Sequence, residues 1–258
     1  MARAEEAPRP GSAAWDLWAA ALHLLFPTPC HVCGAPLDRE RVSCLCGRCW
    51  RALERVPPAG CSRCGWPFPD ADAAAGTERP LCQRCRESQD AFRLARAVLR
   101  YRTEGTARAA ILLAKHGGRL TLLRHLAWLL AAEASRYLPM AGWDGLVPVP
   151  LHWRRRWERG FNQAEVLARA VGRQHGLCVL RRVLVRVRST PTQEGDPEAR
   201  RRNVRGAFAV RSPQAVRGRR LLLVDDVFTT GATANACARA LLDSGAAEVG
   251  VLTLARVE

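Results

Sequence analysis

Lysine is almost missing from this chain of 258 residues: Lys115 is the only one, and the other 39 of the 40 basic residues are arginine. Acidic residues are also few, because only 24 of them are present and the net charge is +16. This excess of positive charge favours an anionic partner, such as a phosphate-bearing ligand, a nucleic acid or a membrane surface. The arginine content alone does not establish a function, since coding bias also raises it.

Long hydrophobic runs are missing as well. No stretch reaches the ~20 apolar residues that a membrane helix needs. The first residues carry Glu5 and Glu6, and the apolar segment after them contains Asp16 and His23, which argues against an export signal. We therefore expect a cytoplasmic protein without a transmembrane segment. Cysteines of such proteins bind metals more often than they form disulfides, and this chain has 11.

Eight of the cysteines form four pairs of one spacing, Cys-x-x-Cys, and each such turn offers two thiolates to a tetrahedral zinc ion. The pairs are Cys30 and Cys33, Cys46 and Cys49, Cys61 and Cys64, and Cys82 and Cys85. Four pairs predict two structural zinc sites, the first two pairs binding one ion and the last two the other. An interleaved pairing stays open, and Cys44 could compete with Cys46. Metal binding would supply the folding energy of so short a segment.

The density of cysteines falls after Cys85, which places a domain boundary near Asp90. We predict a tail with an amphipathic helix over residues 1–29, a small zinc domain over 30–90, and a third part over 91–258. In the third part, short apolar runs alternate with helical patterns, which predicts an α/β domain with a parallel sheet. The expected strands cover 146–150, 221–226 and 249–254, and the expected helices cover 162–175 and 233–242.

The most informative segment is residues 221–233, with the sequence LLLVDDVFTTGAT. Asp225 and Asp226 stand at the carboxyl end of a buried strand, where open α/β sheets bind their ligands. The small residues that follow lead into a helix and can present backbone N–H groups and hydroxyls to a phosphate. Adjacent carboxylates do not suit that phosphate, so we expect them to face vicinal hydroxyls or a metal.

This segment resembles the phosphoribosyl pyrophosphate (PRPP) motif of type I phosphoribosyltransferases. The resemblance implies a parallel sheet with helices on both faces, with Asp225 and Asp226 on the ribose hydroxyls. It implies that the 5′-phosphate is bound by Thr229, Thr230, Gly231, Ala232 and Thr233. PRPP also needs cations for its pyrophosphate and usually Mg²⁺. Thr229 stands where 6-oxopurine enzymes carry their general-base aspartate, so no catalytic residue is assigned.

Three further runs resemble the ComF family of competence-related proteins: PVPLH at 148–152, ERGFNQA at 158–164 and RNV at 202–204. That family also carries an N-terminal zinc ribbon, and the similarity spans residues 22–256. It implies a PRPP-binding protein that assists the uptake of single-stranded DNA during transformation. Transfer of phosphoribose to an unknown acceptor stays open. The alternatives are an active phosphoribosyltransferase of nucleotide metabolism and a PRPP-sensing regulator without catalysis.

Positive charge is concentrated in residues 151–220, which hold 18 arginines and 5 acids, or +13 of the net +16. This cluster follows the strand that ends at Pro150, the position of the pyrophosphate loop in the resembled fold. The residues that we assign to the pyrophosphate are Lys115, His152, Arg154, Arg155 and Arg159. Residues 189–206 form a long polar loop that predicts a lid over the site. No feature of the sequence assigns an oligomeric state.

Overall fold

The structure is a computed structural model in which the following residues are described: 28–37, 44–68, 80–116, 119–151, 157, 160–188 and 206–258. Three predicted features lie outside these residues. They are the amphipathic helix before residue 28, the stretch with His152, Arg154, Arg155 and Arg159, and residues 189–205 of the lid.

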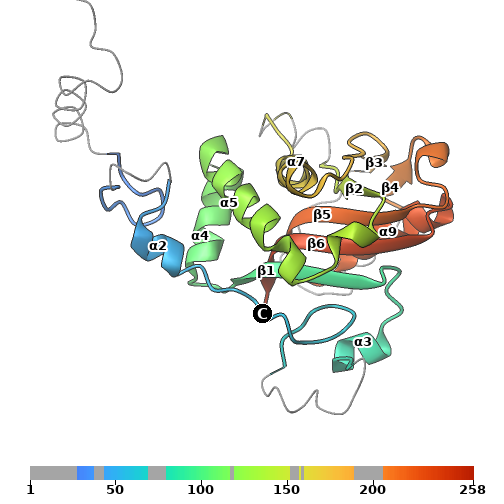
Figure 1. The fold of residues 1–258 in the computed structure, drawn as a ribbon, viewed down its shortest axis with the longest axis horizontal. Coiled ribbons are helices and arrows are strands. Elements are labelled where there is room, and N and C mark those ends of the chain that lie inside the picture. The colour runs from blue at the N-terminus through green and yellow to red at the C-terminus, as the bar shows by residue number, and fades with distance from the viewer. Residues whose placement is uncertain are drawn as a thin grey trace, which may run out of the picture.

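A parallel sheet forms the centre of the described chain, with the strand order β1-β6-β5-β2 (Figure 1). The strands are β1 (Leu94–Tyr101), β2 (Gly145–Pro148), β5 (Arg220–Phe228) and β6 (Glu248–Val257). The predicted parallel sheet is therefore confirmed. Strand β5 is two residues longer at its carboxyl end than predicted, because its pairing with β6 continues to Phe228. Val227 and Phe228 consequently follow the two acids within the strand.

Helices cover both faces of this sheet, as predicted, because neighbouring residues of β5 point to opposite sides. Leu222 and Val224 pack in the core formed with α4 (Thr106–His116), α5 (Leu120–Glu133) and α7 (Gln163–His175). Leu221 and Leu223 pack on the other face. That face is covered by α9 (Ala232–Asp243) and the antiparallel pair β3 (Leu184–Arg186) and β4 (Phe208–Val210). The described residues also contain three short 3₁₀ helices: Ala134–Arg136, Met140–Gly142 and Pro213–Ala215.

Helix α7 begins where the sequence predicted, and its start is tied to the end of β2. The Asn162 side chain caps the helix by accepting a 3.1 Å hydrogen bond from the Ala164 N–H. The same side chain donates a 3.0 Å hydrogen bond to the Val149 carbonyl. Gly176 ends the helix in the left-handed conformation. The start of α7 is thus held at the carboxyl edge of the sheet.

The cysteine-rich segment forms two separate ribbons that dock at different places. The first ribbon (residues 28–37 and 44–52), with the short helix α2 (Gly47–Arg51), lies beside α4 (Figure 1). Its Leu45 is buried in the same core as α4 and α5. The second ribbon (residues 60–68 and 80–88), with α3 (Gln83–Glu87), lies below β1. There the Ala95 N–H donates a 2.6 Å hydrogen bond to the Arg63 carbonyl. Within the described residues, no helix is both long enough and apolar enough to span a membrane.

Candidate functional site

The two acids of β5 leave the strand on opposite faces of the sheet. The Asp226 Oδ2 lies 2.9 Å from the Lys115 Nζ of α4. Asp225 lies on the side of α9 and β3, where the charges of Asp225 and Arg186 interact. The Asp225 Oδ1 accepts a 2.8 Å hydrogen bond from the Asp226 N–H. A ligand that contacts both carboxylates must therefore lie across the end of the strand rather than on one face.

The position of these acids in the topology is one where α/β sheets bind ligands. The connection after β2 leads to α7 on one face of the sheet, whereas β5 leads to α9 on the other face. Beyond Val224 the pairing of β2 with β5 ends. Adjacent parallel strands whose helices lie on opposite faces form a topological switch point, which is the usual ligand position in open sheets.

Asp225 has an unusual titration. Burial, and then the nearby charge of Asp226, raises the pKa of Asp225 to about 7, although Lys115 and Arg186 act in the opposite direction. Near neutral pH its carboxyl group is therefore divided between the protonated and the ionised form. Burial also raises the pKa of Cys237, which keeps this thiol protonated. Hydroxyl donors or a cation at the end of β5 would stabilise the ionised form of Asp225.

The loop after β5 connects this strand directly to α9. Gly231 precedes α9 in the left-handed conformation, with φ 77°. A Cβ atom at this position would lie 2.8 Å from the Phe228 Cζ, so conformation and space both require glycine. Among the described residues, no hydrogen-bond acceptor is present for the backbone N–H groups of Thr229, Thr230 and Gly231. These three N–H groups are free, whereas the Ala232 N–H at the start of α9 donates a 3.4 Å hydrogen bond to the Thr230 hydroxyl.

The two cysteine clusters fit zinc ions. The structure brings together Cys30, Cys33, Cys46 and Cys49, and separately Cys61, Cys64, Cys82 and Cys85, each set with its sulfur atoms within 4.8 Å of one another. Cys33 Sγ and Cys46 Sγ are 3.6 Å apart, as are Cys64 Sγ and Cys82 Sγ. Zinc–sulfur bonds of ~2.3 Å place tetrahedral sulfur atoms ~3.8 Å apart, in agreement with these distances. The pairing is therefore sequential, and Cys44 lies outside both sets.

One cysteine of each cluster has a lowered pKa, whereas other cysteines of the same clusters have a raised one. Although burial opposes it, N–H groups of Cys33, Cys46 and Val32 lower the pKa of Cys30 to about 6. Side-chain hydrogen bonds with Cys64 and Cys85 hold the pKa of Cys61 far below its ordinary value. Filled with four sulfur ligands, each site leaves zinc no open position for a substrate, so the metal has a structural role.

Of the residues that the sequence assigned to the pyrophosphate, only Lys115 lies in the described part of the chain, where it contacts Asp226. Two residues near the loop were missed. Arg186 of β3 acts on Asp225, and Arg84 of the second ribbon donates a hydrogen bond to the Thr230 carbonyl. Nothing distinguishes these two among 39 arginines in the sequence, because they reach the site only through folding.

Comparison with known proteins finds two domains along the chain, one in the cysteine-rich segment and one in the C-terminal part. Residues 21–86 match the double zinc ribbon domain, and residues 158–258 match the phosphoribosyl transferase domain. The DNA utilization protein YhgH of Salmonella typhi is 34% identical over 241 residues, which cover 90% of this chain and 99% of that protein. Competence protein F of Haemophilus influenzae is 37% identical over 136 residues, or 52% of this chain and 59% of that protein.

Among solved structures, a glutamine phosphoribosylpyrophosphate amidotransferase from B. subtilis is 20% identical and aligns with a TM-score of 0.34. The alignment covers 51% of this chain and 25% of that one. The fold assignment rests instead on the strand order and on the match of residues 158–258. With similarity to YhgH along nearly the whole length of both chains, this protein belongs to the ComF/YhgH family, in which a double zinc ribbon precedes a phosphoribosyltransferase-like domain.

Proposed function

We propose that the chain binds PRPP together with Mg²⁺ at the carboxyl end of β5. The observation that carries this proposal is the order of groups along one short segment. Two acids are followed by a loop with free N–H groups, and the loop leads into the N-terminus of α9. An anion at that terminus interacts favourably with the helix dipole as well as with the N–H groups.

The proposed roles follow from the chemistry of each group. The loop from Thr229 to Thr233 donates hydrogen bonds to the 5′-phosphate. Asp225 and Asp226 accept hydrogen bonds from the two ribose hydroxyls across the end of the strand. Lys115, already beside Asp226, supplies a cation near the same sugar. Mg²⁺, when bound, neutralises the pyrophosphate. The proposal assigns ligand binding to these residues and names no catalytic residue.

Calorimetric titration of the zinc-loaded protein with PRPP and Mg²⁺ tests this proposal. Two charge-assisted hydrogen bonds of about 1.5 kcal/mol each correspond to at least about a 100-fold loss of affinity in the double variant Asp225→Asn/Asp226→Asn. Asp243→Asn removes one charge at the exposed far end of α9 and is expected to bind like the wild type. Wild-type affinity in the double variant would refute the assignment of the site.

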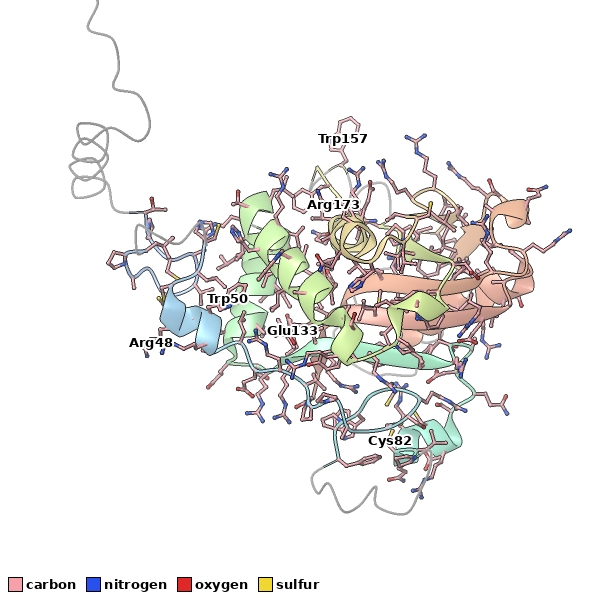
Figure 2. All side chains as sticks on the ribbon, viewed as in Figure 1. Arg48, Trp50, Cys82, Glu133, Trp157 and Arg173 are labelled. Carbon is pink, nitrogen blue, oxygen red and sulfur yellow. The ribbon has the colours of Figure 1, made fainter. Side chains whose placement is uncertain are left out.

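We further propose that the protein serves the use or uptake of DNA, as the names of its relatives indicate for those proteins. One structural observation supports a nucleic-acid partner. A groove of about 920 Å³ between α5 and α7 is lined by Arg124, Arg169 and Arg173, with Glu165 as its only acid among the described residues. The exposed Trp157 stands above Arg173 (Figure 2). Basic grooves flanked by aromatic side chains bind single strands by electrostatic attraction and stacking. With this role we propose a cytoplasmic location.

A salt titration of the affinity for single-stranded DNA tests the second proposal. Each lost phosphate contact lowers the salt slope by about 0.7. The double variant Arg124→Gln/Arg173→Gln is therefore expected to bind more weakly and with a slope reduced by about 1.4. Arg219→Gln, an exposed arginine outside the groove, is the control. Binding that does not respond to salt, or the absence of binding, would refute this partner.

A further inference from the structure

We infer that Arg84 of the second ribbon is a positioning residue for the loop of Thr229 to Thr233. It holds the peptide between Thr230 and Gly231 in the orientation that a bound phosphate requires. The inference rests on the proposed function and adds a residue from the zinc ribbon to the phosphate site.

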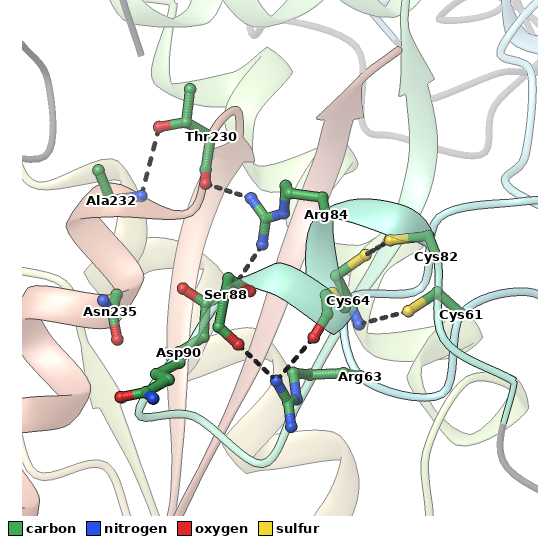
Figure 3. Close-up of polar contacts among 12 residues, drawn as sticks. Cys61, Arg63, Cys64, Cys82, Arg84, Ser88, Asp90, Thr230, Ala232 and Asn235 are labelled. Carbon is green, nitrogen blue, oxygen red and sulfur yellow. Dashed lines mark hydrogen bonds and ion pairs between the residues drawn. The ribbon is translucent and has the colours of Figure 1, made fainter. Parts of the chain in front are cut away.

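Arg84 lies in α3 between two cysteines of the second zinc cluster, Cys82 and Cys85. Figure 3 shows its guanidinium group reaching from the ribbon to the loop. One nitrogen, Nη1, donates a hydrogen bond to the Thr230 carbonyl oxygen, and Nη2 lies 2.8 Å from the Asp90 Oδ2. The same guanidinium lies 5.8 Å from the centre of the Phe228 ring. Arg84 therefore contacts both the end of β5 and the loop after it.

The contact with the Thr230 carbonyl fixes the direction of an N–H group. In a trans peptide the C=O and the N–H point in opposite directions, and the described residues include no cis peptide. With the Thr230 carbonyl turned toward Arg84, the N–H of Gly231 points away from the ribbon. Gly231 also tolerates the reversed orientation, because glycine adopts positive and negative φ at similar cost. Without Arg84 this peptide is free to rotate, and its carbonyl oxygen would then face the phosphate.

The ribbon supports Arg84 from several sides. Asp90, which orients the guanidinium group, also accepts a 3.2 Å hydrogen bond from the Ser88 hydroxyl. Arg63 donates hydrogen bonds to the carbonyls of Cys85 and Ser88, at 3.1 and 2.9 Å. The chain after the ribbon is attached to α9, since the Ala91 N–H donates a 2.6 Å hydrogen bond to Asn235 Oδ1. Arg84 is thus preorganised, and its contact with the loop requires little additional ordering.

Two probes separate a positioning role from a general structural role. Ribose 5-phosphate occupies the loop, whereas pyrophosphate with Mg²⁺ does not use it. Arg84→Gln is expected to weaken ribose 5-phosphate binding by about tenfold or more. This is the factor for losing one charge-assisted hydrogen bond, here the bond from the Gly231 N–H to the phosphate. Pyrophosphate affinity is expected to stay unchanged. Arg86→Gln, in the same helix on the other side of Cys85, is the matched control and is expected to leave both affinities unchanged. Zinc analysis must give about two ions per chain for each variant.

Two further variants sharpen the test. Arg84→Lys keeps the charge and is expected to recover part of the lost affinity. Asp90→Asn keeps Arg84 but weakens its orientation, and is expected to give a smaller loss for ribose 5-phosphate alone. The inference is overturned if Arg84→Gln binds ribose 5-phosphate like the wild type, or if both probes are weakened equally. Failure of the wild type to bind ribose 5-phosphate would instead refute the proposed site, and the inference with it.

Discussion

Replacing Asp225 by asparagine is expected to stabilise the ligand-free protein at neutral pH while it removes the proposed ribose contact. The folded protein holds the proton of Asp225 up to about pH 7, whereas an unfolded chain releases it near the ordinary value of 3.8. The folded state therefore binds more protons over this range, and its stability falls as the pH rises from about 4 to about 7. Asparagine has no such proton, so the variant escapes this loss.

The size of the effect follows from the same two values. The pKa values of Asp225 in the folded and unfolded chain differ by about 3, which corresponds to about 4 kcal/mol. This free energy is an upper limit, because the residue is only partly buried. The gain in the free energy of unfolding should be near zero at about pH 4, about 1–2 kcal/mol at about pH 5, and up to about 4 kcal/mol at about pH 8.

Urea unfolding of the zinc-loaded wild type and of Asp225→Asn at several pH values measures this difference in the free energy of unfolding. The two proteins share all their other titrating groups. Asp226→Asn is the comparison. It loses an ion pair with the partly exposed Lys115, worth about 1 kcal/mol or less, but it also removes a charge that raises the pKa of Asp225, so its net effect should be smaller than that of Asp225→Asn. Equal stability of wild type and Asp225→Asn at about pH 8, or a difference that does not change with pH, would show that the fold does not raise the pKa of Asp225.

Three further predictions concern the loop, the helix cap and the zinc ligands. Gly231→Ala combines a left-handed backbone with a clash against Phe228 and should lower the unfolding free energy by about 1–3 kcal/mol, measured in urea. Asn162→Ala removes the cap of α7 and the bond to the carboxyl end of β2, so thermal unfolding should show a loss of about 1–2 kcal/mol. Cys46→Ser should reduce the zinc content to about one ion per chain, whereas Cys44→Ser should leave about two; the reverse result would contradict the ligand sets.

Local patterns made part of this site predictable from the sequence. Each Cys-x-x-Cys turn brings its own two ligands together, so the ligands of both clusters could be predicted before their relative positions were known. The end of β5 was predictable for a similar reason, since a run of aliphatics, two acids and a glycine loop occupy consecutive positions. The cap formed by Asn162 is local as well, because its side chain accepts from the N–H of Ala164, two residues further on.

The contacts across the fold could not be predicted in this way. Arg84 and Thr230 are 146 residues apart, and no periodicity relates them. The alternation of β5 predicts that its two acids face opposite sides, but only the packing of α4 places Lys115 against Asp226. The length of β5 was underestimated because pairing with β6, rather than local hydrophobicity, determines where the strand ends.

The position of β6 between β1 and β5 has a consequence for how the protein is made. This strand follows the other three of its sheet along the chain, yet it holds two of them together. While the ribosome is still adding residues, β1 and β5 have no common neighbour, and their aliphatic edges remain exposed to chaperones and to other nascent chains. Completion of the sheet is thus delayed until translation has passed β6, although both metal-binding segments have by then long left the exit tunnel.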